Sequence, residues 1–211
     1  MIKSVQILQQ NFLFHPSGAL YWEDRDMLLI SDVHLGKISH FRKYGSAVPS
    51  GAIAENFRRL SEVIDHFNPG RLVFLGDLFH SYANIEWDMF TSWLQEITAE
   101  VSLVVGNHDV ISALKYEEVG VEVQQEMLLG GFFLSHHPEL KEGYFNICGH
   151  LHPGYKLRGR GRQTLPLKCF YKSEQQLILP AFGEFTGNYW ISPNEGDEVY
   201  AITKKEVFLV N

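Results

Sequence analysis

The chain has 211 residues and a formal net charge of −7 at pH 7. This length fits a single domain, residues 1–211, that can bury a sizeable core. The acidic balance argues against a protein that coats nucleic acid generally, although it permits a local basic patch. The two cysteines, Cys148 and Cys169, provide no disulfide framework and suit a reducing compartment.

Two features of the sequence bear on where the protein works. The N-terminal segment, residues 1–8, lacks the apolar core of a signal peptide. No apolar run approaches the ~20 residues that a membrane-spanning helix needs. We therefore expect a soluble, cytoplasmic protein without a membrane partner.

The first half of the chain repeats a strand, a polar motif and a helix. Strands are expected at residues 2–9, 19–22, 27–31, 71–75 and 101–105. Ser50 is expected to cap a first helix that ends before Pro69, and Asn84 is expected to cap a second. Strands and helices that alternate at this spacing predict βαβ units and a largely parallel sheet.

The second half of the chain is rich in expected strands. They lie at residues 121–127, 131–135, 144–148, 165–171, 176–179, 198–203 and 207–210. No linker, repeat or low-complexity segment separates them from the first half. We therefore expect an α/β fold in which a second sheet, antiparallel or mixed, packs on the first.

Polar side chains follow five of the expected strands. Asp32 and His34 come directly after the buried strand at residues 27–31, and because they are two residues apart their side chains point to one side. The later strand ends add Asp77, Asn107, His108, His136, His150 and His152. Open α/β sheets bind their ligands beyond such strand ends.

These side chains form an inventory that suits two metal ions. A single histidine after a strand is usually structural, and Gly, Asn and Asp favour turns, but five such motifs in one chain are not explained this way. Oxygen and nitrogen donors without thiolates suit Mn, Fe, Zn and similar divalent ions. Two ions about 3.5–4 Å apart that share a carboxylate can clamp both oxygens of a displacement at phosphorus.

Two basic segments are candidates for the walls of a substrate site. Residues 37–45 follow Asp32 and His34 directly, and residues 156–162 follow His152 almost directly. Arginine can grip phosphate oxygens bidentately. The candidate phosphate contacts are Lys37, Arg42, Arg158, Arg160 and Arg162. The alternative is that both segments are solvated loops.

The order of the motifs resembles the signature of the calcineurin-like metallophosphoesterase superfamily. The resemblance rests on Asp32-x-His34, Gly76-Asp77, Gly106-Asn107-His108-Asp109, His136 and Gly149-His150-x-His152. It implies a four-layer α/β/β/α sandwich with two packed mixed sheets, which agrees with the two sheets expected above.

A narrower resemblance covers nearly the whole chain. It rests on Lys37–Gly45 with Pro49, Gly76–Ser81, Gly149–Pro153 and Leu179–Gly187. These segments resemble the DNA ligase-associated metallophosphoesterase family, also called PdeM. That family implies phosphodiesterase or nuclease activity in a DNA-repair context, and a functional association with a DNA ligase and a helicase.

The resemblance also implies roles for individual residues. One metal ion would be held by Asp32, His34, Asp77 and His152. The other would be held by Asp77, Asn107, His136 and His150, so that Asp77 bridges the two. His108 would protonate the leaving oxygen or stabilise charge on the phosphoryl group, and Asp109 would orient His108. Mn is the expected metal, with Fe, Zn, Ni and Co as alternatives.

Two assignments stay open at this point. His136 and His137 are adjacent, and we favour His136 as the ligand because it comes straight off the expected strand. His80 stands where many superfamily members carry an acidic residue, so it is a candidate phosphate contact or a residue behind the ligands.

Three functions are compatible with these residues. The first is a two-metal phosphodiesterase or nuclease acting on nucleic acid or a nucleotide. The second is a phosphomonoesterase for a small or protein-borne phosphate. The third is a non-catalytic binding module on the same scaffold, which is disfavoured because the chain keeps every expected ligand. The oligomeric state is left open by the sequence.

Overall fold

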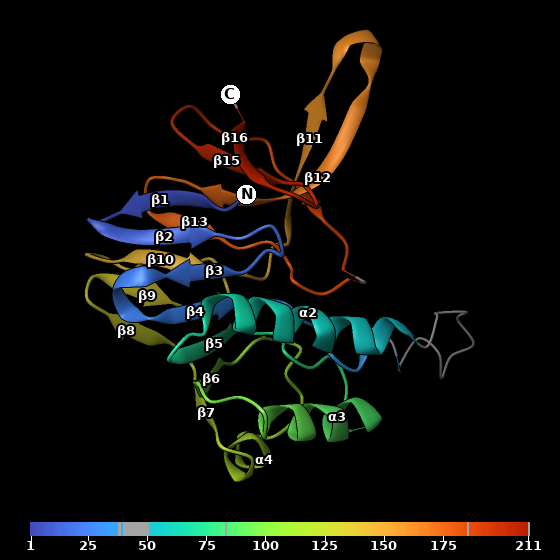
Figure 1. The fold of residues 1–211 in the computed structure, drawn as a ribbon. Helices are drawn as coiled ribbons and strands as arrows, with labels where there is room; N and C mark the ends of the chain where they lie inside the picture. The colour runs from blue at the N-terminus through green and yellow to red at the C-terminus, as the bar shows by residue number, and fades with distance from the viewer. Residues whose placement is uncertain (38, 40–50, 83, 185, 211) are drawn as a thin grey trace.

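A computed structural model describes the protein over residues 1–211 except residues 38, 40–50, 83, 185 and 211 (Figure 1). Its first sheet has seven strands in chain order: β1 (Lys3–Ile7), β2 (Gln10–Phe14), β3 (Leu20–Trp22), β4 (Met27–Ile30), β5 (Arg71–Leu75), β6 (Glu100–Val104) and β7 (Val121–Gln124). Strands β1 to β4 pair antiparallel, whereas β4 to β7 pair parallel. The carboxyl ends of β4, β5 and β6 therefore lie at one edge of the sheet.

The first expected strand, residues 2–9, is wrong in its extent. β1 ends at Ile7. Leu8 and Gln9 form the two-residue loop of the β1–β2 hairpin, with φ of 47° and 63°. Positive φ at both central positions is the geometry of a type I′ turn, whose twist suits a hairpin. Such turns usually contain Asn or Gly. Because neither is present, the turn had no signature in the sequence.

The described helices are α2 (Gly51–Phe67), α3 (Ile85–Leu94) and α4 (Ala113–Glu118). They share one hydrophobic core with a face of the first sheet, in which Leu60 of α2 and Phe90 of α3 are fully buried. The Asn84 side chain accepts a hydrogen bond of 2.8 Å from the N–H of Glu86, which confirms the expected cap. The other expected cap, Ser50, lies outside the described residues. The short helix α4 was not expected.

The second sheet is mixed, as expected. Its strands are β8 (Met127–Leu129), β9 (Phe132–Leu134), β10 (Phe145–Cys148), β11 (Pro153–Arg158), β12 (Thr164–Lys172), β13 (Gln176–Ile178), β14 (Tyr189–Trp190), β15 (Glu198–Ile202) and β16 (Val207–Val210). β10 runs parallel to β9 and β13, and β12 runs antiparallel to β13. The expected strand at residues 121–127 is divided, because β7 joins the first sheet and β8 the second. Strands β11 and β14 were not expected.

The two sheets pack face to face on a second hydrophobic core. Leu28 and Ile30 of β4 point toward the helices, whereas Met27 and Leu29 point toward the second sheet. This alternation buries β4 on both faces, which explains its uninterrupted apolar sequence. Aromatic rings fill the space between the sheets, and the Phe14 and Phe170 rings, one from each sheet, lie 4.5 Å apart.

The described α-helices cover one face of the first sheet. In Figure 1 α2, α3 and α4 occupy the lower half of the picture, on one side of the first sheet, and the β11–β12 hairpin projects at the top right. The two packed mixed sheets confirm the expected α/β fold, and the described residues place no α-helix on the outer face of the second sheet. The parallel crossover from β9 to β10, residues 135–144, is a loop without a helix. None of the described helices is long and apolar enough to span a membrane.

Candidate metal centre

The predicted ligands converge on the edge where β4, β5 and β6 end. The loops that follow these strands are hydrogen-bonded to one another, because the Asp32 N–H donates to the Gly76 carbonyl (3.2 Å) and the His34 N–H to the Asp77 carbonyl (2.9 Å). His136 follows β9 and His150 follows β10 in the second sheet. Ligands from both sheets thus meet above the core that joins them.

The backbone at this edge is held in an unusual conformation. Five predicted ligands have positive φ: Asp32 (55°), His34 (54°), Asp77 (50°), His150 (68°) and His152 (49°). Positive φ is uncommon outside glycine, and residues in sparsely populated backbone regions cost roughly 1–3 kcal/mol each. Such conformations cluster at functional sites, and five in one place point to a site whose geometry the surrounding contacts enforce.

Three glycines allow the ligands to approach one another. A Cβ at Gly76 would lie 2.2 Å from His136 Nδ1, one at Gly106 would lie 2.3 Å from Asp77 Oδ1, and one at Gly149 would lie 2.5 Å from Asp32 Oδ2. No side chain of any kind fits at these distances. The glycines of the Gly-Asp, Gly-Asn-His-Asp and Gly-His motifs are therefore required so that the candidate ligands can lie this close together.

Asp32, His34 and His152 form a first group of ligand atoms. His152 Nε2 lies 3.1 Å from Asp32 Oδ1 and 3.3 Å from His34 Nε2. The other oxygen of Asp32 accepts hydrogen bonds from the Ser31 hydroxyl (2.7 Å) and the His150 N–H (2.9 Å). Asp32 Oδ1 is buried and, within the part of the chain that the structure describes, accepts no well-aligned hydrogen bond, although His152 Nε2 lies close to it. A buried carboxylate oxygen of this kind is costly unless a cation lies beside it.

His136, Asn107 and His150 form a second group. His136 Nδ1 donates to the Leu75 carbonyl (3.1 Å), and because a carbonyl only accepts, Nε2 of the neutral ring keeps its lone pair. That nitrogen lies 3.0 Å from Asn107 Oδ1 and 3.2 Å from His150 Nδ1. Backbone carbonyls commonly fix the tautomer of a metal-binding histidine in this way. His152 is held similarly, since its Nδ1 donates to the Gly187 carbonyl (3.2 Å).

Asp77 lies between the two groups. Its Oδ1 is 3.3 Å from His136 Nε2, and its Oδ2 is 3.8 Å from His34 Nε2. The His108 N–H donates to Asp77 Oδ1 (2.9 Å) and fixes the carboxylate. A carboxylate oxygen and an unprotonated ring nitrogen repel one another at such distances unless a cation offsets the repulsion. The donor set therefore fits two divalent ions, with Asp77 placed to contact both.

Burial keeps the histidines of the centre ready to bind metal. It lowers the pKa of His34 to about 3, against the opposing charge of Asp32. Burial also lowers the pKa of His150, and the neighbouring His137 and His136 lower it further. A metal ligand must be deprotonated, so at neutral pH protons compete weakly for these two rings.

His108 and His80 form a pair beside the first group. Their ring centroids are 4.4 Å apart, and they lie 5.8 Å and 5.4 Å from the His34 ring, respectively. The His108 side chain is exposed. The hydrogen bond from His108 to Asp77 comes from the backbone N–H and does not involve the ring. Both rings can therefore face a substrate at the mouth of the site.

Asp109 has a structural role that the sequence did not indicate, and its expected role in orienting His108 stays a prediction. Both of its oxygens accept backbone N–H bonds, from Asp77 (2.9 Å), Phe79 (3.0 Å) and Gly106 (2.8 Å). The carboxylate thus ties the loop after β5 to the loop after β6, and its hydrogen bonds do not go to the His108 ring. Burial raises the pKa of Asp109 to about 6, although the three N–H donors oppose that shift.

Asp109→Asn is expected to weaken the fold and the metal centre together. The amide keeps one oxygen, so at least one of the three N–H donors loses its acceptor, which typically costs ~1–3 kcal/mol for a buried group. Denaturant unfolding and Mn titration would both detect the change, with the exposed Asp88→Asn as control. Normal stability with a rate defect equal to that of His108→Ala would instead support the orienting role.

The structure also assigns work to residues that the sequence did not single out. Glu86, fully buried in the first turn of α3, accepts hydrogen bonds from the Gly36 N–H (2.7 Å) and from the Ser39 N–H (3.1 Å) and hydroxyl (2.6 Å). It thereby anchors the chain that follows His34. An acidic residue in the first turn of a helix is common, so its sequence position gave no signal.

A second support lies behind Asp32. The Phe182 N–H donates to the Ser31 carbonyl (2.9 Å) and the Gly183 N–H to the Asp32 carbonyl (3.1 Å). Lys168 Nζ donates to the carbonyls of Ala181 (2.7 Å) and Gly183 (2.9 Å). The Leu179–Gly187 motif carried part of the narrower resemblance but supplies no candidate ligand. Its backbone instead supports the loop that contains Ser31 and Asp32.

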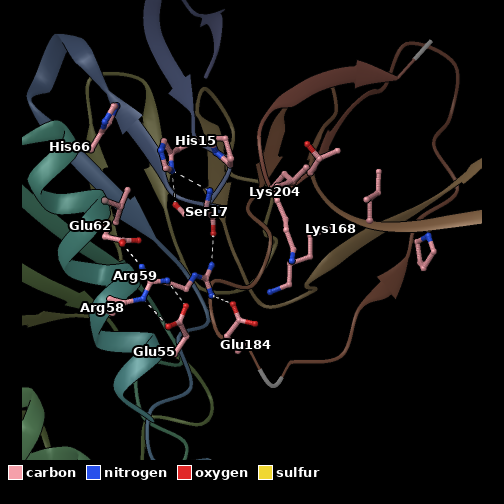
Figure 2. A pocket seen from close by; sticks show the side chains of 16 residues that line it. His15, Ser17, Glu55, Arg58, Arg59, Glu62, His66, Lys168, Glu184 and Lys204 are labelled. Atoms are coloured by element: carbon pink, nitrogen blue, oxygen red, sulfur yellow. Dashed lines mark hydrogen bonds and ion pairs between the residues drawn. The ribbon is translucent and has the colours of Figure 1, made fainter. Parts of the chain in front are cut away.

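Arg59 completes this support at a cavity of about 780 Å³. Figure 2 shows Arg59 reaching from α2 to Ser17 and Glu184, with Lys168 on the facing strand. Arg59 donates to the Phe182 carbonyl (2.8 Å), and its guanidinium lies 4.4 Å from the Phe182 ring centroid. Two cations therefore hold the segment at residues 181–183 from behind.

Lys168→Met is expected to weaken metal binding without removing any ligand. The substitution leaves two carbonyls without their donor and loosens the segment that holds Ser31 and Asp32. The fall in Mn affinity should stay within the ~10–100-fold typical of residues behind a ligand, and Lys168→Arg should restore part of it. Lys172→Met, on the same strand, is the control. Unchanged affinity in Lys168→Met would contradict the support.

The expected phosphate contacts are not all beside the centre. Lys37 is half-buried, and burial lowers the pKa of its amino group, against the opposing charge of Asp77. Arg42 lies outside the described residues. Arg158 ends β11 and Arg160 begins a 3₁₀ turn, Arg160–Arg162, at the tip of the hairpin. These cations are thus remote from His152, contrary to the expectation of a loop beside the ligands.

The adjacent histidines are also separated by the fold. His136 is buried among the ligands described above, whereas the His137 side chain is exposed and its ring lies 4.0 Å from the His150 ring. His137 can still reach a common point with His136 and His150. The geometry favours His136 as the residue that faces Asp77.

One solved structure agrees closely with this architecture, and a second covers most of the chain. The crystal structure of Pseudomonas putida nuclease MPE superposes with a TM-score of 0.84 and 29% identity over 100% of both chains. The phosphoesterase Yfce from E. coli matches at 18% identity and a TM-score of 0.43, over 88% of this chain and 96% of that chain. No curated protein matches the sequence.

The family profile described as calcineurin-like phosphoesterase matches residues 26–206, which include all the ligands discussed above. The match begins just before β4 and ends just before β16, so it covers the parallel part of the first sheet, most of the second sheet and the centre at their edge. The sequence resemblance, the two mixed sheets and the convergent donor set agree with it. The chain belongs to the calcineurin-like phosphoesterase family and is a metal-dependent phosphoesterase.

Proposed function

We propose that the protein is a two-metal phosphodiesterase that cleaves nucleic acid or a nucleotide. The observation that carries the proposal is the position of Asp77, whose two oxygens face His136 on one side and His34 on the other. One shared carboxylate between two groups of nitrogen and oxygen donors is the arrangement that suits a pair of divalent ions.

Each part of the site then has a task. Asp32, His34, Asp77 and His152 would hold one ion, and Asp77, Asn107, His136 and His150 would hold the other. When bound, such ions neutralise charge on the phosphate and activate the attacking water. The exposed His108 imidazole gives a proton to the leaving oxygen, and His80, 4.4 Å away, supports the same oxygen or the phosphate. Lys37 adds positive charge near Asp77.

Action on nucleic acid is supported by likeness and by charge. The relative at 29% identity is a nuclease, and the motifs at Lys37–Gly45 and Leu179–Gly187 resemble the PdeM family. A cationic hairpin in an acidic chain suits a polyanionic substrate. We therefore propose a DNA-repair context, with functional association with a DNA ligase and a helicase, Mn as the native metal, and a cytoplasmic location that agrees with two buried, unpaired cysteines.

A substrate panel tests the proposal. Metal-free protein should be inactive, and Mn should restore turnover of bis(4-nitrophenyl) phosphate and of single-stranded DNA, double-stranded DNA or RNA. Fe, Zn, Ni and Co are compared in parallel. Preference for 4-nitrophenyl phosphate over the diester would favour a phosphomonoesterase. Protein that binds no metal would point to a binding module.

A further inference from the structure

The β11–β12 hairpin concentrates positive charge in an acidic protein. Residues 143–173 contain no Asp or Glu, although the whole chain has a net charge of −7. The same stretch carries six cationic residues: Lys156, Arg158, Arg160, Arg162, Lys168 and Lys172. Lys168 and Lys172 are engaged near the base, with backbone carbonyls and with Glu198. Nearer the tip, Arg158 and Arg160 have no acidic partner among the described residues.

The charge lies on one face of the hairpin. Along β11, Gly154, Lys156 and Arg158 alternate with Tyr155 and Leu157. The first three residues therefore face one side of the hairpin, and the other two face the opposite side. The Lys156 and Arg158 side chains are exposed, and Tyr155 and Leu157 are half-buried. The face opposite to the cations is therefore apolar.

An aromatic ring lies at the base of the cationic face. A Cβ at Gly154 would lie 2.9 Å from Trp190 Cζ3, so the indole covers Gly154 on the side that Lys156 and Arg158 share. Lys156 Nζ is 4.9 Å from the centroid of that ring. The Trp190 side chain is still 40% exposed. We call Trp190, Lys156, Arg158 and Arg160 the arm face.

The arm face begins at the metal centre. β11 starts at the residue after the ligand His152, and the Tyr189 N–H donates to the His152 carbonyl (3.0 Å). The Ile191 N–H donates to the Gly154 carbonyl (2.9 Å), so β14 fixes Trp190 beside the first residues of β11. At ~3.3 Å per residue, Arg158 lies about 20 Å from His152. That length matches roughly six nucleotides of a stacked strand.

We propose that the arm face binds the part of a single-stranded nucleic acid that extends beyond the scissile phosphate. A base stacks on Trp190, and Lys156, Arg158 and Arg160 contact successive phosphates along the hairpin. Surfaces that bind single strands combine a basic track with an aromatic platform in this way, and a base must be unpaired to stack. This inference rests on the proposed action on nucleic-acid phosphodiesters.

The test measures binding separately from cleavage. Fluorescence anisotropy follows labelled oligothymidylates of two, four, eight and twelve nucleotides on Mn-loaded protein in a His108→Ala background, which slows hydrolysis. The arm variant is Arg158→Gln with Arg160→Gln. The control is Arg71→Gln with Lys115→Gln, which removes the same charge from the start of β5 and from α4. In all variants, bis(4-nitrophenyl) phosphate turnover without the His108 substitution reports on the metal centre.

The arm face predicts a dependence on substrate length. Affinity should rise with length up to about six to eight nucleotides in the parent and the control, and it should be nearly flat in the arm variant. Two lost phosphate contacts should reduce the slope of log K against log salt by about 1.4. Turnover of the small diester should be unchanged. Equal length dependence in the arm variant and its control would overturn the inference.

Trp190 supplies an independent check. Trp190→Ala should weaken binding of the longer oligonucleotides by about 5- to 100-fold, and Trp190→Phe, which keeps an aromatic face, should restore most of it. Equal binding in both variants and the parent would remove the stacking platform from the inference. Absence of diester turnover in the parent with Mn would contradict the proposed function instead, and the binding measurements would still decide the arm face.

Discussion

Asp77→Asn is expected to abolish turnover by depriving both groups of ligands of their shared charge. The amide oxygen can keep the 2.9 Å hydrogen bond from the His108 N–H. Its NH₂ group then occupies the position of Oδ2, which faces His34, and an amide nitrogen cannot bind metal there. The ion of the first group should be lost most readily. The loss of activity should exceed the ~10–100-fold that removal of a residue behind a ligand costs.

Metal content distinguishes this result from general damage. Elemental analysis should give two ions per chain in the parent and fewer than two in Asp77→Asn, with an unchanged far-UV spectrum. Asp65→Asn, an exposed carboxylate on α2, should keep both ions and full turnover. A variant that retained two ions and normal activity would refute the bridging role of Asp77.

The elements most accessible from sequence were those with strong periodicity and caps. Residues 71–75 form β5 with the expected limits, and Asn84 caps α3 as expected. The convergence of the candidate ligands was also predictable, because each follows an apolar strand and the parallel β4, β5 and β6 must bring their ends together. The local sequence pattern and the fold agree at this edge of the sheet. Short motifs were therefore enough to predict which side chains lie together there.

The remainder depended on contacts between distant residues. The hairpin at Leu8 and Gln9 lacks the usual turn residues, and the first residues after His152 carried no strand signal, although they begin β11. Glu86 and Lys168 act through backbone groups roughly fifty and thirteen residues away. Such partners are set by tertiary packing, so no local pattern reveals them.

The other large effect is expected from His108→Ala. Hydrolysis of a DNA phosphodiester should fall by ~10²–10⁴-fold, the usual contribution of a general acid, while both metal ions stay bound. The reason is structural, since the exposed imidazole is removed but the backbone N–H that fixes Asp77 remains. Single-turnover kinetics measure the loss of rate, and metal analysis measures whether both ions stay bound. The control is His66→Ala, which removes an exposed imidazole on α2.

The leaving group decides between an acid and a purely structural role. A nitrophenolate departs with little help from a proton, whereas the sugar oxygen of a nucleic acid needs one. The rate loss in His108→Ala should therefore be much smaller for bis(4-nitrophenyl) phosphate than for DNA. Equal losses with both metals present would indicate that His108 stabilises the phosphoryl group instead. Loss of an ion would place its ring among the ligands, against its exposed position and the backbone contact to Asp77.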